Sequence, residues 1–246
     1  MTNSLRTAAL AAILAAVPLA ASASTFLAEG AVHDEFADAL DGGLADALAI
    51  ETPAEGGALA GDLAGLVGTE IAGSSSAEGD TGDGDTGFAF ASAGTTSVLR
   101  VENSGAAPIV VSYRLDWSVD ASAGGVGWAT ASVQLATGTG DASGFVWDPL
   151  DLIFAAVAGA DATSLFDSDG GGFEAMLRLA PLETVTLGLL VDAVGFADAL
   201  DGGRGDFLAF ADASVMVLDI ATVPLPATLP MLLAALGGLG LARRRA

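Results

Sequence analysis

A strict period of two along residues 109–120 limits the fold more than any other feature of this 246-residue chain. The even positions of this stretch are mainly Ser, Arg and Asp, whereas the odd positions are Ile109, Val111, Tyr113, Leu115, Trp117 and Val119. Successive side chains of a β-strand point to opposite faces. The pattern therefore predicts a long strand with one buried face.

Weaker alternation recurs at 129–135, 185–191 and 209–217, and Asn103-Ser104-Gly105 supplies a turn between 98–102 and 109–120. Several strands separated by Gly, Asp and Ser turns favour an all-β fold, namely an antiparallel β-sandwich or jelly-roll-like body over residues 87–222. Alanine-rich alternation also arises by chance. The prediction therefore depends most on the strand that carries Trp117.

The segment 24–86 is rich in Ala, Gly, Asp and Glu and carries few large apolar residues. We expect it to be an acidic Ala/Gly-rich segment that is only partly ordered. A helical spacing over Phe36–Ile50 is interrupted by Gly42-Gly43, at a cost of about 1 kcal/mol for each glycine. Residues 74–87 are typical of a turn-rich acidic loop or linker.

One internal repeat stands out, because Phe-Ala-Asp-Ala-Leu-Asp-Gly-Gly occurs at 36–43 and again at 196–203. Two interpretations are open. In the first, a ligand-binding turn is repeated, and Asp38 and Asp41 correspond to Asp198 and Asp201. In the second, two equivalent corners pack their Phe and Leu side chains while Asp-Gly-Gly turns the chain. We favour the corners, since Asp-Gly is ordinary turn chemistry.

The first 23 residues have the parts of a secretory signal peptide. Arg6 and the amino terminus are positive, residues 8–16 are apolar, and Ala21-Ser22-Ala23 is a small-residue cleavage site after Ala23. The alternative is an N-terminal membrane anchor, which the short apolar core disfavours. We expect export by the general secretion machinery and a mature chain that begins at Ser24.

At the other end of the chain, residues 230–242 are all Pro, Met, Leu, Ala or Gly. Thirteen helical residues rise only about 20 Å, but the apolar residues from Leu225 onward bring the stretch close to a minimal membrane span. The arginines that follow favour the cytoplasmic face, which leaves the body outside. The alternative is a buried C-terminal helix, but a globular helix normally has a polar face.

The order of an extended proline motif, an apolar helix and an arginine cluster resembles the PEP-CTERM class of bacterial sorting signals. The motif matches the VPLPA variant letter for letter, and the residues concerned are Val223, Pro224, Leu225, Pro226, Ala227, Arg243, Arg244 and Arg245. The resemblance covers residues 223–246. It implies an inner-membrane intermediate whose tail is removed by an exosortase-type protease, and then a place on the surface or in the extracellular matrix of a Gram-negative bacterium.

Charge narrows the classes of partner. All 31 acids lie between residues 24 and 222, where the bases are four arginines, so this body carries a formal charge of −27. Such a surface repels nucleic acid and anionic membranes, so we expect contact with a membrane only through the tail. Because the sequence contains no cysteine, it forms no disulfides.

Calcium is the one cofactor that the sequence suggests. Carboxylates in glycine-rich stretches can surround a hard cation, and they form two clusters, Asp80/Asp83/Asp85 and Asp167/Asp169 with Glu174. Neither cluster has the spacing of the twelve-residue calcium loop. A solvated acidic loop is the interpretation that we favour.

Catalytic residue types are scarce. His33 is the only histidine, and the absence of lysine and cysteine excludes Schiff-base and thiol mechanisms. We therefore expect a non-enzymatic structural or adhesive protein. One alternative is a carbohydrate-binding module, in which Trp117, Trp128 or Trp147 stacks on sugar rings. The other is a polysaccharide hydrolase, which needs two carboxyls about 5–9.5 Å apart.

Overall fold

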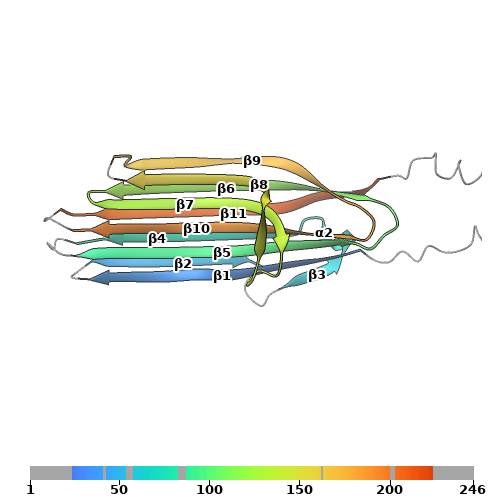
Figure 1. Ribbon diagram of the computed structural model, residues 1–246, viewed down its shortest axis with the longest axis horizontal. Helices are drawn as coiled ribbons and strands as arrows, with labels where there is room; N and C mark the ends of the chain where they lie inside the picture. The colour runs from blue at the N-terminus through green and yellow to red at the C-terminus, as the bar shows by residue number, and fades with distance from the viewer. Residues whose placement is uncertain are drawn as a thin grey trace, which may run out of the picture.

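The computed structural model describes residues 24–40, 43–53, 58–82, 87–161, 163–199 and 203–223, and for residues 148–151 it describes the backbone alone. These residues form two antiparallel sheets packed face to face (Figure 1). The predicted all-β sandwich is confirmed. The signal peptide, with Ala21 and Ala23, and residues 224–246 of the sorting tail lie outside the described residues.

Sheet A contains six strands, in the spatial order β3 (Leu59–Asp62), β1 (Thr25–Leu40), β5 (Phe88–Asn103), β10 (Glu183–Asp198), β7 (Gly127–Thr139) and β8 (Val146–Asp161). Sheet B contains five, in the order β2 (Leu44–Thr52), β4 (Glu70–Asp80), β11 (Asp206–Thr222), β6 (Ile109–Gly124) and β9 (Phe166–Leu179). One helical turn, α2 (Leu63–Leu66), follows β3. Within the described residues, no helix has the length and apolarity to span a membrane.

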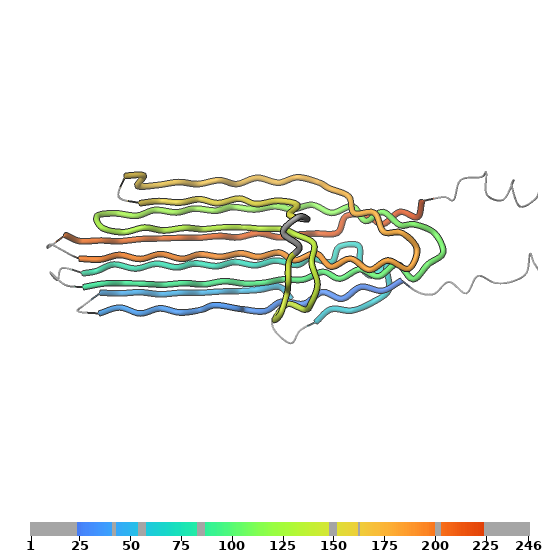
Figure 2. Tube along the Cα trace, in the orientation of Figure 1, coloured from blue at the N-terminus to red at the C-terminus, as the bar shows by residue number. Residues whose placement is uncertain are grey.

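Successive strands alternate between the sheets except for β7 and β8, which are neighbours in sheet A. Five pairs of successive strands have one strand in each sheet, namely β1–β2, β4–β5, β6–β7, β8–β9 and β10–β11. Apart from β3, which is an extra strand at the edge of sheet A, these pairs follow one another in the same spatial order in both sheets. Their five connections gather at one end of the elongated sandwich, which we call the arch end (Figure 2). β1 begins and β11 ends at the opposite end, the terminal end. This crossing connectivity is compatible with the jelly-roll-like body that we predicted.

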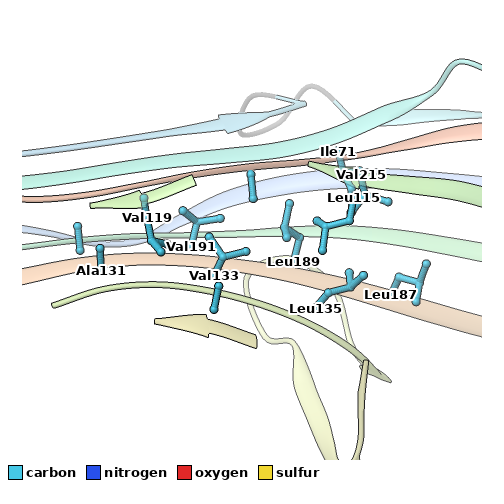
Figure 3. Close-up of a cluster of buried hydrophobic side chains, with 14 of the residues drawn as sticks. Ile71, Leu115, Val119, Ala131, Val133, Leu135, Leu187, Leu189, Val191 and Val215 are labelled. Atoms are coloured by element: carbon cyan, nitrogen blue, oxygen red, sulfur yellow. The ribbon is translucent and has the colours of Figure 1, made fainter. Parts of the chain in front are cut away.

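The core between the sheets changes in character along the strands. Towards the terminal end it contains large aliphatic side chains, such as Leu115, Leu135 and Leu189, which are all fully buried (Figure 3). Towards the arch end the buried positions are mostly alanine, and Phe207 is a large ring among them. Trp117 packs against the core from β6, as the alternation predicts.

The described residues of the range 24–86 belong to the same two sheets as the rest of the body. β1 pairs with β5 along its whole length, and β4 lies between β2 and β11. The expected boundary at residue 86 therefore falls at the connection from β4 to β5, inside the sandwich. The apolar spacing over residues 36–50 resembles that of a helix, but this stretch contains the end of β1 and most of β2.

The two copies of the internal repeat fall at equivalent strand ends. Its first copy ends β1 before β2 and its second copy ends β10 before β11, and β1 and β10 are the two neighbours of β5. The prediction that Phe and Leu pack at these corners is wrong for the first copy, since Phe36 and Leu40 are exposed. Asp41 and Asp201 lie outside the described residues.

Candidate functional site: an aromatic patch on the outer face of sheet A

Three aromatic residues lie in a row across the middle strands of sheet A. Phe90 of β5 is directly opposite Phe196 of β10, which is directly opposite Trp128 of β7. Residues opposite one another share a face of the sheet, and neighbouring strands are about 4.8 Å apart. Because Ala89, Ala129 and Ala197 on the same strands are buried, these three rings lie on the outer face.

Two more phenylalanines widen this row. The rings of Phe36 and Phe90 have centroids 5.9 Å apart, and those of Phe88 and Phe196 stack at 6.4 Å. Phe36 is 51% exposed and Trp128 is 40% exposed. We call Phe36, Phe88, Phe90, Phe196 and Trp128 the aromatic patch. Phe88, Phe90 and Phe196 are half-buried. Large exposed apolar patches are typical of interaction sites, which makes this patch the candidate site.

A hollow of about 350 Å³ lies beside the Trp128 end of the patch. It is lined by both rings at that end and by the turn residues around them: Val126, Gly127, Trp128, Asp161, Thr163 and Phe196. Asp161 is the residue directly opposite Trp128 on β8. The hollow therefore combines two aromatic walls with one carboxylate.

The carboxylate of Asp161 is held by the turn that follows β8. Its Oδ1 accepts hydrogen bonds from Thr163 Oγ1 at 2.6 Å and from the backbone N–H groups of Thr163 and Ser164, both at 2.8 Å. These bonds, the Thr163 hydroxyl first, lower the pKa of Asp161 below its ordinary value. The group is therefore ionised at neutral pH.

His33 lies on the same outer face, closer to the middle of the strands. A β-bulge between Val32 and Asp34 places it there. Its Nδ1 is 3.1 Å from Thr96 Oγ1 and its Nε2 is 2.9 Å from Asp192 Oδ1. The hydrogen bond to Asp192 raises the pKa of His33, against an opposing effect of burial. Thr96 is only 5% exposed, so its hydroxyl supports the ring from below.

The other two tryptophans are not part of the patch. The ring centroid of Trp117 lies 4.3 Å from that of Phe154 and 6.0 Å from that of Phe173, between the sheets. Trp147 is half-buried on β8. Of the three tryptophans that the sequence offers for sugar stacking, Trp128 is therefore the one that is well exposed.

Of the predicted calcium ligands, Asp80, Asp167 and Asp169 lie in the part of the chain that the structure describes. Asp80 accepts a hydrogen bond from Arg204 Nε at 3.2 Å, and Asp83 and Asp85 lie outside the described residues. Asp167 Oδ2 accepts from the Gly159 N–H at 3.1 Å, whereas Asp169 Oδ1 accepts from its neighbour Gly170. Among the residues that the structure describes, no three His, Asp or Glu side chains are grouped to hold a metal ion. Calcium binding stays a prediction.

A second hollow, of about 500 Å³, opens at the arch end of sheet B. Its lining includes four carboxylates, from Asp46, Glu78, Asp80 and Asp206. Glycoside hydrolysis needs one carboxyl that is protonated as an acid. The side-chain hydrogen bond from Arg204 lowers the pKa of Asp80, which makes it a poor proton donor. The polysaccharide hydrolase alternative stays a prediction, and no residue is assigned the role of general acid.

Sequence reasoning named Trp128 but missed the four phenylalanines of the aromatic patch. Two of them, Phe36 and Phe196, are the first residues of the two repeat copies. The repeat therefore contained a signal for the site. We had assigned its phenylalanines to packing, whereas Phe36 points to solvent and contacts Phe90 of β5, and Phe196 contacts Phe88 of β5.

Comparison with known proteins gives no family. A scan against protein-family models finds no match, and neither does a search of curated proteins. Among solved structures, TmCBM61 in complex with β-1,4-galactotriose is 12% identical over 58% of this chain and 70% of that one, with a TM-score of 0.19. A lipoprotein from Bacteroides thetaiotaomicron is 10% identical over 80% and 87% of the two chains, with a TM-score of 0.24. A non-crystalline cellulose-specific carbohydrate-binding module, CBM28, is 13% identical over 52% and 67%, with a TM-score of 0.17. At these values the likenesses decide neither the fold nor the function.

Proposed function

We propose that this protein is a non-enzymatic, exported β-sandwich that adheres to extracellular polysaccharide through its aromatic patch. The observation that carries the proposal is the row of Phe90, Phe196 and Trp128, in register on the outer face of sheet A. Aromatic rings offer flat, rigid apolar surface with a large area for each side chain. The apolar faces of pyranose rings can stack on such a row while their hydroxyl groups stay hydrated.

Charge and composition support a role outside the cell. The body carries 31 acids and no lysine or cysteine, so it is highly soluble and independent of disulfides. We propose that the general secretion machinery exports it and that the sorting tail holds it at the inner membrane. An exosortase-type protease then removes the tail, and the protein reaches the cell surface or matrix. Val223, the last described residue, donates its N–H to Pro108 O at 2.8 Å at the terminal end. The tail would therefore leave the sandwich far from the patch.

The proposal is tested by measuring binding to a panel of soluble β-glucans, galactans and amino-sugar polymers by affinity electrophoresis and calorimetry. Trp128→Ala removes the most exposed large ring at one end of the row. With a stacking energy on a pyranose ring equal to that of an aromatic side chain on a nucleobase, about 1–3 kcal/mol, the dissociation constant should rise by roughly five- to 150-fold. Circular dichroism and the urea midpoint should stay unchanged, because Trp128 is exposed.

The matched control is Phe166→Ala. Phe166 is 63% exposed, but it lies on β9, at the edge of the other sheet. This variant should bind every polymer as the wild type does. Equal binding by wild type, Trp128→Ala and Phe166→Ala would contradict the assignment of the patch, and so would an absence of binding to the whole panel.

A further inference from the structure

The hollow beside Trp128 is built differently from the rest of the aromatic patch. Its walls are the rings of Trp128 and Phe196, and its one carboxylate belongs to Asp161. Its volume of about 350 Å³ is at the small end of the range for ligand sites. It therefore suits a single ring-sized unit of a longer chain.

The Oδ2 atom of Asp161 is available to a ligand. All three of its hydrogen bonds within the turn go to Oδ1, and among the described residues none goes to Oδ2. The turn fixes the carboxylate in place, so a ligand does not have to order it. A cation that reaches the hollow would meet a preformed negative group beside an aromatic face, and aromatic faces also attract cations.

The surroundings strengthen this preference for positive charge. Asp38 lies directly opposite Phe90, and Asp198 directly opposite Phe88. The one arginine in the strands of sheet A is Arg100, ten residues or about 33 Å along β5 from Phe90. The backbone of Arg204 lies beside the turn that contains Val126, but its guanidinium pairs with Asp80. An anionic polymer such as a polyuronate would therefore be repelled, and a cationic one attracted.

We propose that the hollow selects an amino-sugar unit with a free, protonated amine, so that the partner of the patch is a cationic polysaccharide. This inference rests on the proposed function and adds to it the chemical class of the polymer. The sugar ring packs against Trp128 and Phe196, and the ammonium group pairs with Asp161 Oδ2. A second copy of the chain is the less suitable occupant, because its own patch is flanked by the same carboxylates.

The test uses the purified full chain and two oligosaccharides of equal length, hexa-glucosamine and its fully N-acetylated form, in calorimetric titrations at a pH at which the amine is protonated. The wild type should bind the amino form at least tenfold more tightly. Asp161→Asn keeps an oxygen for the turn but removes the charge, so it should abolish this preference and leave the affinity for the acetylated form unchanged. Asp169→Asn, on the edge strand of sheet B, should change neither.

The outcomes separate the two proposals. If the wild type binds both oligosaccharides equally, or if Asp161→Asn keeps the preference, the amino-sugar inference is overturned while patch-mediated binding stands. If Trp128→Ala weakens neither interaction, the patch itself is the wrong site and both proposals fail. Self-association that Trp128→Ala abolishes, with no sugar bound by the wild type, would assign the patch to a second copy and overturn both.

Discussion

The packing at the arch end can be tested at a single glycine, Gly195 of β10. A methyl group added there would lie 2.0 Å from Cδ2, 2.6 Å from Cε2 and 2.7 Å from Cγ of Phe207. Ordinary carbon contacts begin near 3.4 Å, so the ring would have to move by more than 1 Å. It has nowhere to go, because Phe207 is 3% exposed and a Cβ at Gly79 would already lie 2.4 Å from the opposite edge of the ring.

Gly195→Ala should therefore behave as an overpacking substitution, which costs about 1–3 kcal/mol of the free energy of unfolding. For a domain of this size the melting temperature should fall by roughly 2–4 °C for each kcal/mol. Urea denaturation followed by tryptophan fluorescence measures the change. The matched control is Gly159→Ala on β8, where an added Cβ meets nothing within 4 Å. Its stability should stay within about 0.5 kcal/mol of the wild type.

A double-mutant cycle identifies the ring as the cause. Phe207→Leu shortens the side chain that the new methyl group would strike. In this background Gly195→Ala should cost less than in the wild type, with a coupling energy of about 0.5–3 kcal/mol. Additive costs would refute the reasoning, and so would a Gly195→Ala variant as stable as Gly159→Ala.

Three further predictions concern other parts of the sandwich. Because the pKa of His33 is raised above its ordinary value of about 6.5, mainly by its hydrogen bond to Asp192, its contribution to stability is full below that value and is lost as pH rises through the raised pKa. The stability difference between wild type and His33→Gln should therefore shrink as the pH rises from below about 6.5 through the raised pKa, as urea midpoints would show. Thr95→Val should leave stability unchanged or raise it by about 1 kcal/mol in the same assay, because Thr95 Oγ1 is buried without a hydrogen-bond partner among the described residues. Since the chain has no cysteine, Val126→Cys at the arch end and Leu182→Cys at the terminal end can each be coupled to a surface, and only the Leu182 attachment should leave polysaccharide binding intact.

The sequence predicts the fold class because a few strands carry large residues on one face. Tyr113 and Trp117 belong to such a strand, β6, and burial of these side chains decides the register of that strand. The same reasoning places Trp117 inside and leaves Trp128, on the other parity of its own strand, outside. Where alternation involves large residues, the structure follows it.

β4 shows why the first quarter of the chain could not be predicted in the same way. Its inward positions include Gly73, Ser75 and Ala77, which carry little hydrophobic signal. A Cβ at Gly73 would lie 2.2 Å from Thr95 Oγ1, and Ser75 Oγ donates to Val191 O at 2.7 Å across the core. Small residues are needed here because the opposite sheet lies so close. The small residues that suggest a linker in the sequence are therefore the ones that the close packing of the two sheets requires.

The aromatic patch was beyond prediction for a different reason, which is strand order. Phe90, Phe196 and Trp128 come from β5, β10 and β7, and nothing local in the sequence says that these strands are neighbours in that order. The repeat at 36–43 and 196–203 contained part of the answer, because two identical corners on either side of one strand must present their phenylalanines to it from both sides.

The aromatic patch lies near the arch end of the strands, at the opposite end of the sandwich from the start of the sorting tail. Phe36, Phe88 and Phe196 lie within five residues of the arch-end limits of their strands, and both β1 and β11 have their free ends at the terminal end. A strand of 16 residues is roughly 50 Å long, so an attachment at the terminal end would hold the patch about that far from its anchor. If the tail holds the protein at the membrane before it is removed, as we propose, the binding surface already faces outward at that stage. Adhesion to a polymer would then not depend on release of the tail.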